Sequence, residues 1–227
     1  MKVALYTACY GRYETPKPIR LLDIPTVLYT DNVETADIAR ERGWQTVNVV
    51  PHGIATLKGA PAVTAPMLAH KWWKCHPDAA LPNVDVSLWI DGSMELLVDD
   101  YVDRCLGALG DDDWACVPHP SRHCIYPEAQ FSATLARYDA RAVTAQAAFY
   151  RETVGHPANW GLVATGANVR RHTANVLELG QQWWDECINW SHQDQLSLPV
   201  LFRLAEGKVR WNTRLPWFEW WHLHQHG

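Results

Sequence analysis

Short apolar runs alternate with amphipathic segments along most of the chain. The apolar runs predict strands at 3–8, 26–30, 46–50, 84–90, 114–117 and 162–168. The amphipathic segments predict helices at 34–42, 66–76, 100–109, 130–151, 173–189 and 194–205, the last interrupted or kinked near Pro199. This alternation predicts an α/β fold with a mostly parallel, Rossmann-like sheet flanked by helices.

Composition narrows the class of protein. The chain has 227 residues, 48% hydrophobic and 20% charged, which is typical of a globular protein and fits one domain spanning 1–227. The net charge is -5 and no run of Lys or Arg occurs, which argues against a broad nucleic-acid-binding surface.

The cysteines and the N-terminal residues indicate in which cellular compartment the protein is expected. No two of the six cysteines form a C-x-x-C pair, which argues against a zinc ribbon or a thioredoxin-like site. The first residues lack the apolar core of a signal peptide, and no apolar stretch reaches the ~18 residues of a membrane span. We therefore expect a cytoplasmic protein with reduced thiols and no membrane association.

The apolar run 84–90 ends at Asp91-Gly92-Ser93. In open α/β sheets, ligands bind just beyond the carboxyl ends of the strands. The small residues Gly92 and Ser93 let a ligand approach the backbone closely, and Asp91 could anchor a divalent metal that carries a diphosphate. The alternative is an ordinary Asp-Gly turn.

Polar groups also follow three other predicted strands. The first strand, which contains Thr7, leads into Tyr10-Gly11, the second ends at Asp31, and the fifth precedes His119-Pro120-Ser121-Arg122. Their convergence at one edge of a sheet would form a pocket. Asp31 could accept a hydrogen bond from a base or a ribose hydroxyl, or could form an Asx turn.

Charged side chains elsewhere add candidates for binding or catalysis. Lys71 and Lys74 share one helix face, where they would neutralise a diphosphate or be simply solvated. Arg122 suits a phosphate or a carboxylate, and Glu128 suits acid/base work, unless the two form a structural ion pair. Asp194 would reach the reacting sugar, or cap a helix.

The C-terminal segment carries alternating histidines. In an extended chain His222 and His224 share one face with His226, and a neutral imidazole together with Asp91 would suit Mn²⁺ or a similar ion. The alternative is that these histidines bind no metal, because terminal residues are usually poorly ordered.

Four ordered motifs carry a resemblance to a known family. They are Ser87-Leu88-Trp89-Ile90-Asp91-Gly92-Ser93, His119-Pro120-x-Arg122-x-x-x-Tyr126-x-Glu128-Ala129, Asn168-Val169-x-Arg171-His172-Thr173 and Asp194-Gln195-Leu196-Ser197. Together they resemble the glycosyltransferase-like domain family that includes plant mucilage-related proteins and bacterial and viral members. The likeness spans roughly residues 3 to 205.

The resemblance implies a GT-A-type nucleotide-sugar transferase, with a UDP-sugar as the expected donor. In such enzymes an Asp-x-Asp motif binds a metal and the donor diphosphate; here the second carboxylate is replaced by Ser93. Mn²⁺ or Mg²⁺ is the expected cofactor, with Asp91, Ser93, His222 and His224 as candidate ligands.

The candidate roles divide among donor binding, acceptor binding and catalysis. The donor-binding candidates are Thr7, Tyr10, Gly11, Asp31, Lys71, Lys74, Asp91, Gly92 and Ser93. The acceptor-binding candidates are His119, Tyr126, Asn168 and Gln195, and the catalytic candidates are Asp194, Glu128 and Arg122. Asp194 or Glu128 would be the base of an inverting reaction, whereas Asp194 would stabilise the reacting centre of a retaining one.

The acceptor and two competing functions stay open at this point. A glycan, a protein, a small molecule and a hydroxymethylated DNA base of viral origin are all compatible acceptors. A local phosphate-binding strip from Arg170-Arg171-His172, Arg210 and Arg214 would favour DNA. The alternatives are a non-catalytic nucleotide- or sugar-binding module and a metal-dependent hydrolase, although the dense acidic run 111–113 precedes a strand, at the wrong end of the sheet.

Overall fold

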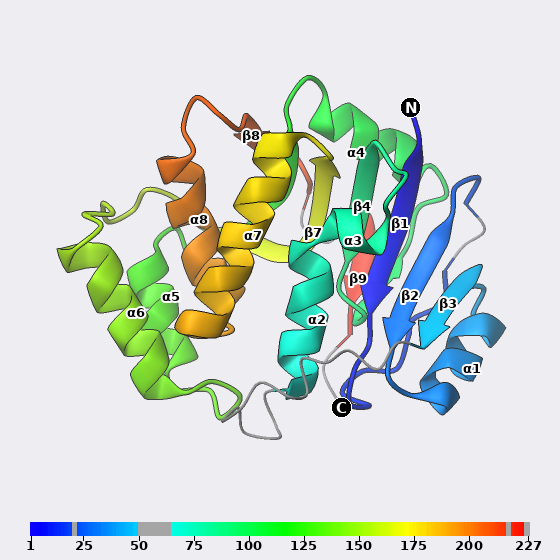
Figure 1. Cartoon of the computed structure of the whole chain (residues 1–227), viewed down its shortest axis with the longest axis horizontal. Coiled ribbons are helices and arrows are strands. Elements are labelled where there is room, and N and C mark those ends of the chain that lie inside the picture. The colour runs from blue at the N-terminus through cyan, green and yellow to red at the C-terminus, as the bar shows by residue number, and fades with distance from the viewer. Residues whose placement is uncertain (20–21, 50–64, 217–218, 225–227) are drawn as a thin grey trace.

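A seven-stranded sheet forms the centre of the computed structural model, which describes residues 1–19, 22–49, 65–216 and 219–224 (Figure 1). The strand order is β3-β2-β1-β4-β7-β6-β8. The strands are β1 (Val3–Ala8), β2 (Thr26–Thr30), β3 (Thr46–Val49), β4 (Val86–Ile90), β6 (Trp114–Pro118), β7 (Val163–Arg171) and β8 (Trp211–Asn212). The described residues also include a separate pair, β5 (Met94–Leu96) and β9 (Trp221–Leu223).

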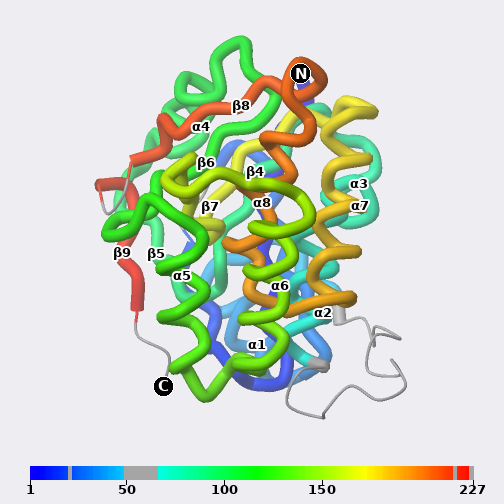
Figure 2. Tube along the Cα trace, turned by 90° about the vertical axis from the view of Figure 1, so that its left-hand side faces the viewer, coloured from blue at the N-terminus to red at the C-terminus, as the bar shows by residue number. Residues whose placement is uncertain are grey.

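Helices cover both faces of the sheet, as Figure 2 shows by the separation of α4 from α2, α3 and α7. The helices are α1 (Val33–Glu41), α2 (Ala65–Cys75), α3 (Pro77–Ala80), α4 (Tyr101–Leu109), α5 (Ile125–Ser132), α6 (Ala140–Glu152), α7 (Ala174–Asn189) and α8 (Asp194–Leu204). The predicted α/β class with helices flanking a mostly parallel sheet is confirmed. Within the described parts of the chain, no helix combines the length and the apolar character needed to cross a membrane.

The alternation of side chains along the strands explains why both faces need a cover. In β1, Tyr6 packs into a cluster with Trp73 of α2, whereas Leu5 packs into a cluster with Tyr101 of α4 on the other face. Successive strand side chains point to opposite faces, so a strand buried on both sides is apolar throughout. This is why β1 reads as one continuous apolar run. All six cysteines are buried and free, as predicted.

β7 is the strand that departs from the parallel pattern. It pairs antiparallel with β4 and with β6, and its register with β6 shifts so that Cys116 faces Asn168 but Val117 faces Ala164. Residues 165–167 therefore have no partner in β6. Such irregularities bend a strand and re-aim its side chains. Here the irregularity lies at the same sheet edge as the carboxyl ends of β1 and β4.

One prediction about the helices is wrong. The stretch 130–151 is not one helix, because the chain turns between α5 and α6 and Asp139 caps α6 by accepting from the N–H groups of Arg141 and Ala142. Of the two possibilities for α8, an interruption near Pro199 is excluded, since the helix runs through this residue. The short elements α3, β5, β8 and β9 were not predicted, because they are too brief to show a period.

Two helical glycines give a matched test of the packing. A Cβ atom on Gly180 of α7 would lie 2.4 Å from the backbone oxygen of Cys75, whereas nothing lies within 4 Å of a Cβ on Gly107 of α4. We expect Gly180→Ala to lower the free energy of unfolding by about 1–3 kcal/mol, because α2 and α7 must separate. Gly107→Ala should raise it by about 0.5–1 kcal/mol through helix propensity. Urea denaturation of both variants measures the difference, and an unchanged Gly180→Ala would refute this close helix contact.

Candidate active site

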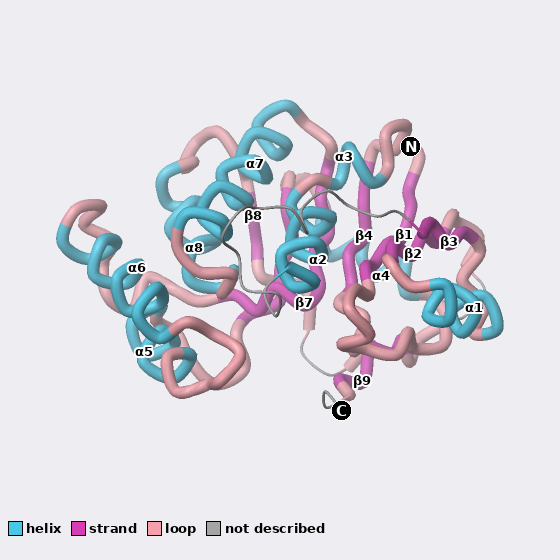
Figure 3. The backbone as a smooth tube through the Cα atoms, turned by 60° about the horizontal axis from the view of Figure 1, so that its bottom comes forward, coloured by secondary structure: helices cyan, strands magenta, loops and turns pink. Residues whose placement is uncertain are grey.

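A cavity of about 230 Å³ opens at the carboxyl ends of β1 and β4. This edge of the sheet faces the reader in Figure 3. The predicted site residues in its wall are Tyr10, Lys71, Asp91, Ser93, Asp194 and Gln195. They come from the β1–β2 loop, α2, the β4–β5 turn and α8. Of the four polar segments predicted to converge, those at Tyr10 and Asp91 contribute to the cavity wall, whereas Asp31 and residues 119–122 do not.

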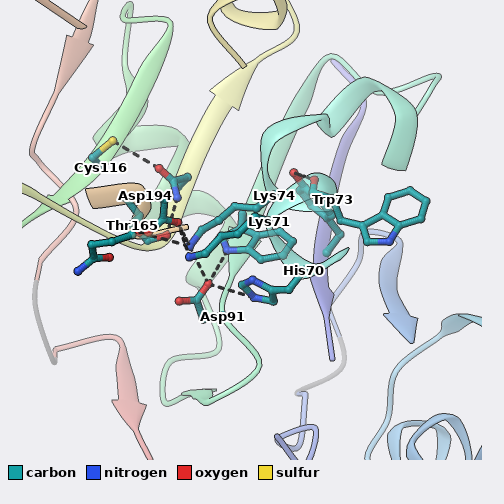
Figure 4. Close-up of polar contacts among 12 residues, drawn as sticks. His70, Lys71, Trp73, Lys74, Asp91, Cys116, Thr165 and Asp194 are labelled. Atoms are coloured by element: carbon teal, nitrogen blue, oxygen red, sulfur yellow. Dashed lines mark hydrogen bonds and ion pairs between the residues drawn. The ribbon is translucent and has the colours of Figure 1, made fainter. Parts of the chain in front are cut away.

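Two carboxylates and two ammonium groups form the base of the site (Figure 4). Lys74 Nζ lies 3.0 Å from Asp91 Oδ1 and 3.0 Å from Asp194 Oδ2, and Lys71 Nζ donates to Asp194 Oδ2 at 2.6 Å. The Lys74 side chain is 0% exposed and that of Asp194 is 2% exposed, while Lys71 lines the cavity. The formal charges of this network cancel, which is what burial of ionised groups requires.

Neighbouring polar groups complete the network. Thr165 Oγ1 lies 3.3 Å from Lys74 Nζ and donates to Asp194 Oδ1 at 3.0 Å, and Trp89 Nε1 donates to Asp91 Oδ1 at 2.8 Å. Thr165 reaches the lysine from the irregular part of β7. The strand irregularity therefore places a hydroxyl group where the buried charges need one.

Charge pairing decides the protonation states of the carboxylates. Burial alone would raise the pKa of Asp194, but the nearby Lys71 and Lys74 outweigh it and hold the pKa well below its ordinary range. The pKa of Asp91 is lowered by the same balance, in which Lys74 and Lys71 oppose the effect of burial. Both carboxylates are thus ionised at neutral pH. The pKa of Lys71 is raised because Asp194 and Asp91 outweigh its burial.

His70 of α2 faces the same carboxylate. Its Nε2 lies 3.6 Å from Asp91 Oδ1, and its ring lies edge-on to Trp89. Burial lowers the pKa of His70 to about 3, although Asp91 acts in the opposite direction. The imidazole is therefore neutral, so it adds no charge to the site and keeps a lone pair on one ring nitrogen.

The remaining donor-binding candidates lie beside the cavity. Gly11 N–H donates to Asp31 Oδ1 at 3.1 Å, so these two predicted residues meet next to Tyr10. Gly92 and Thr7 are absent from the cavity wall. Gly92 instead lies under Cys9 and Glu14, since a Cβ there would come within 2.5 Å of Cys9 Sγ and 2.6 Å of Glu14 Oε2.

The predicted catalytic pair Arg122 and Glu128 lies outside the cavity wall. The Arg122 guanidinium donates to Glu128 Oε2, and His119 Nδ1 accepts from the N–H of Arg122 at 3.0 Å. Glu128 is 3% exposed and its Oε1 accepts from Gln193 Nε2 at 3.0 Å. The structural ion pair considered as the alternative is thus the observed arrangement, connected to the cavity through Gln193.

The acceptor-binding candidates also divide into residues inside and outside the cavity wall. Gln195 lines the cavity, whereas Tyr126 donates to the backbone oxygen of His156. Asn168 is fully buried, where its side chain donates to the Thr165 backbone oxygen at 2.8 Å and accepts from Trp114 Nε1 at 3.0 Å. Asn168 therefore holds the irregular part of β7 in place.

Neither His222 nor His224 joins Asp91 in the cavity wall. In β9 the side chains of Trp221 and Leu223 line the cavity, so His222 between them points to the opposite face. His224 Nε2 lies 2.7 Å from Glu95 Oε2. His226 lies outside the described residues. The residues that the structure describes contain no group of three or more His, Cys, Asp or Glu that could hold a metal ion.

The arginines proposed as a phosphate-binding strip are engaged in internal contacts. Arg170 is fully buried and donates to the Lys74 backbone oxygen at 2.7 Å, and Arg171 donates to the Asp112 backbone oxygen at 3.0 Å. Arg210 and Arg214 form ion pairs with Asp113 and Asp112. Asp112 and Asp113 thus pair with Arg210 and Arg214 at the amino end of β6, away from the cavity.

Sequence reasoning missed most of the residues of the cavity wall. The polar ones include Glu14, His70, Arg137, Thr165 and His192. Glu14, Arg137 and His192 lie in loops, where no periodicity marks a side chain as pointing inward. His192 carried a weak signal, because it stands two residues before the predicted Asp194.

A model of a known protein family matches most of the chain. A model described as TOD1/MUCI70, glycosyltransferase-like domain, matches residues 67–219. "Probable hexosyltransferase MUCI70" of Arabidopsis thaliana is 24% identical over 207 residues, which are 83% of this chain and 34% of the relative. The chain thus spans about a third of the length of this curated relative.

One solved structure reaches a TM-score above 0.5 and shares the fold, and another is similar at a lower score. The apo structure of the bifunctional glycosyltransferase WbbM has a TM-score of 0.52 at 13% identity, over 93% of this chain and 38% of that one. The apo crystal structure of mouse xyloside xylosyltransferase 1 has a TM-score of 0.47 at 9% identity, over 93% and 83%. The matched range of the family model includes Lys71, Lys74, Asp91 and Asp194 but excludes β1, β2 and β9.

Proposed function

We propose a function for the chain, which belongs to the TOD1/MUCI70 glycosyltransferase-like domain family: it transfers a hexosyl group from a UDP-sugar to an acceptor hydroxyl. The observation that carries this proposal is the position of Lys71 and Asp91. Both line a cavity at the carboxyl ends of parallel strands, the edge where α/β sheets bind their ligands.

Lys71 is the group that meets the donor diphosphate. Its Nζ donates to Asp194 at 2.6 Å, and an ammonium group has two further N–H bonds to offer. Held in a fixed place, this charge stabilises the negative charge that develops on the leaving diphosphate without reorganisation during the reaction. Lys74 is fully buried and does not line the cavity. Its role is indirect, because its ion pairs position the carboxylates of Asp91 and Asp194.

The residues at the cavity fit a divalent metal that shares its ligands with a substrate. Asp91 uses Oδ1 in the ion network and keeps Oδ2 apart from it, and Ser93 and Glu14 add oxygen atoms to the same wall. Mg²⁺ and Mn²⁺ favour oxygen ligands, and Mg²⁺ is commonly held by one or two carboxylates together with substrate phosphates. When bound, the ion would add positive charge beside the diphosphate.

This ligand set predicts that metal binding depends on the nucleotide. Because the described residues offer no three-ligand cage, Mn²⁺ alone should leave the melting temperature unchanged, whereas UDP with Mn²⁺ should raise it. A thermal-shift titration with Mn²⁺, UDP and both together measures this. A large shift with Mn²⁺ alone would point to a protein-only metal site and contradict the prediction.

A panel of UDP-sugars tests the function itself. The protein should release UDP from one of them, slowly with water as the acceptor and faster when the correct acceptor is present. UDP release and sugar transfer can be followed by chromatography, with and without EDTA. Binding of UDP-sugars without any turnover would instead favour a non-catalytic binding module.

A further inference from the structure

A hydrogen-bond network runs from the ion pair of Arg122 and Glu128 to the cavity wall. Glu128 Oε2 accepts from the Arg122 guanidinium, and Glu128 Oε1 accepts from Gln193 Nε2 at 3.0 Å. The other end of the Gln193 amide, Oε1, accepts from the Tyr138 hydroxyl group at 3.1 Å. Gln193 and Tyr138 line the cavity, whereas Arg122 and Glu128 do not. The ion pair is therefore connected to the cavity through two consecutive hydrogen bonds.

The ion pair fixes which end of the Gln193 amide faces Tyr138. A carboxylate that is paired with a guanidinium has no proton to donate, so it must meet the NH₂ group of Gln193 rather than the amide oxygen. Ser132 supports this orientation, because its Oγ accepts from Gln193 Nε2 at 2.9 Å and donates to Glu128 Oε1 at 3.2 Å. Both N–H bonds of Gln193 are thus used, and its oxygen is the atom presented to Tyr138.

This orientation leaves the Tyr138 hydroxyl oxygen as an acceptor. Burial raises the pKa of Tyr138, so the hydroxyl group keeps its proton at neutral pH. It donates that single proton to Gln193, which leaves only the lone pairs of the oxygen for another partner. A group that binds to this oxygen must itself donate a hydrogen bond.

The hydroxyl end of Tyr138 lies close to the ion network at the base of the cavity. After burial and the adjacent Arg137, the charges of Asp194 and Lys74 also act on the pKa of Tyr138. The ring packs against the His192 imidazole, with centroids 4.9 Å apart, and against the Arg137 guanidinium at 5.0 Å. The ring is thus engaged by the protein, and the hydroxyl group is the part of Tyr138 that offers a polar contact to a molecule in the cavity.

The sugar is the part of a UDP-sugar that lies nearest to this hydroxyl group. Asp194 accepts from Lys71, the lysine proposed to meet the diphosphate. The hexose is joined directly to that diphosphate, so it is the part of the donor next to Asp194 and Tyr138. Its hydroxyl groups are the hydrogen-bond donors available there.

We propose that the Tyr138 oxygen accepts a hydrogen bond from a hydroxyl group of the hexose to be transferred, and that Glu128 fixes this polarity through Gln193. This inference rests on the proposed glycosyl transfer. Tyr138 is then a specificity-determining residue, and Glu128 is a positioning residue that acts without touching the substrate. A site with an acceptor fixed in this way favours a sugar hydroxyl over the deoxy analogue that lacks it.

Comparison of UDP with the UDP-hexose that the panel identifies tests this contact, since UDP lacks the hexose. In calorimetric titrations with Mn²⁺ present, Tyr138→Phe should bind the UDP-hexose about 3–10-fold more weakly than the wild type, the cost of one neutral hydrogen bond, and should bind UDP equally well. Tyr126→Phe is the matched control and should keep both affinities, because Tyr126 donates to the His156 backbone oxygen outside the cavity wall. An unchanged UDP-hexose affinity in Tyr138→Phe, or an equal loss of both affinities, would overturn the inference.

UDP-deoxyhexoses that each lack one hydroxyl group give a test on the wild type itself. The wild type should bind at least one of them about 3–10-fold more weakly than the parent UDP-hexose. Tyr138→Phe should bind one of these weakened analogues and the parent equally, because the contact is already missing. If every analogue binds the wild type as well as the parent does, no hexose hydroxyl group donates to Tyr138.

The positioning role of Glu128 has a separate readout. In Glu128→Gln the Gln193 amide is free to reverse, so the UDP-hexose should bind more weakly while UDP binds as before. The double variant Glu128→Gln, Tyr138→Phe should bind the UDP-hexose no more weakly than Tyr138→Phe alone, because both changes remove the same contact. Additive losses, or loss of UDP binding in Glu128→Gln, would refute the positioning role. Failure of the wild type to bind UDP would refute the proposed function instead.

Discussion

Replacing Asp194 by alanine is expected to lower the free energy of unfolding by about 3–5 kcal/mol. The substitution removes the shared partner of Lys71 and Lys74, which lie 2.6 and 3.0 Å from its carboxylate. The Lys74 side chain is 0% exposed, so water cannot replace the lost contact without opening the structure. Removing one member of a buried ion network costs far more than the network itself contributes.

Chemical denaturation at pH 7 measures this loss, and Asp37→Ala is its control. Asp37 forms an ion pair with Arg40 on the exposed side of α1, where its side chain is 62% exposed. Such surface pairs contribute at most about 1 kcal/mol. Equal losses in the two variants would show that Asp194 is not part of a buried charge network.

The effect of Asp194 should also depend on pH. Because its pKa is lowered in the folded protein, the carboxylate stabilises the fold fully above the unfolded pKa of about 3.9 and less as the pH falls further. The stability difference between wild type and Asp194→Ala should therefore be constant from pH 6 to 8. The difference should become smaller below about pH 4. A difference that keeps its full pH 7 value down to the lowest accessible pH would contradict the lowered pKa.

Replacing Lys71 by methionine is expected to reduce turnover of the UDP-sugar about 10²–10³-fold, the cost typical of losing one fixed electrostatic contact to a transition state. Lys71 lines the cavity, where we propose that its ammonium group meets the donor diphosphate. The fold should survive, because Asp194 keeps its contacts with Lys74 and Thr165.

UDP release and the melting temperature together decide this prediction. Lys208→Met, which changes an exposed lysine outside the cavity wall, is the matched control and should retain wild-type turnover. If Lys71→Met also keeps wild-type turnover, the diphosphate does not bind at Lys71. A melting temperature far below that of the wild type would instead show that Lys71 is required for folding.

The strands of the sheet could be predicted from the sequence because their signal is local. An apolar run followed by an aspartate or a proline marks a buried strand and its end, and this signal predicted β2, β4 and β6 closely. The reversal of β7 is not local, since its direction depends on pairing with both β4 and β6. The turn between α5 and α6 was missed because its residues favour a helix, while the Asp139 cap and the contact of Tyr138 with Gln193 stabilise the break.

The same distinction holds for the site. Lys71 and Asp91 were both predicted to bind the donor, because each lies at a recognisable place in a regular element, a helix face or a strand end. Arg122 and Glu128 were chemically plausible, but their mutual attraction places them in a neighbouring ion pair. Glu14 and His192 enter the cavity from loops, so only the folded chain brings them to it.

A crystal structure of the protein with UDP and Mn²⁺ is the measurement that tests the central claim most directly. The account predicts the diphosphate in the cavity at the carboxyl ends of β1 and β4, with a phosphate oxygen within hydrogen-bond distance of Lys71 Nζ and Asp91 on the same side. It also predicts Lys74 unmoved between Asp91 and Asp194. A UDP molecule bound elsewhere on the protein, with this cavity empty, would contradict the assignment of the donor site.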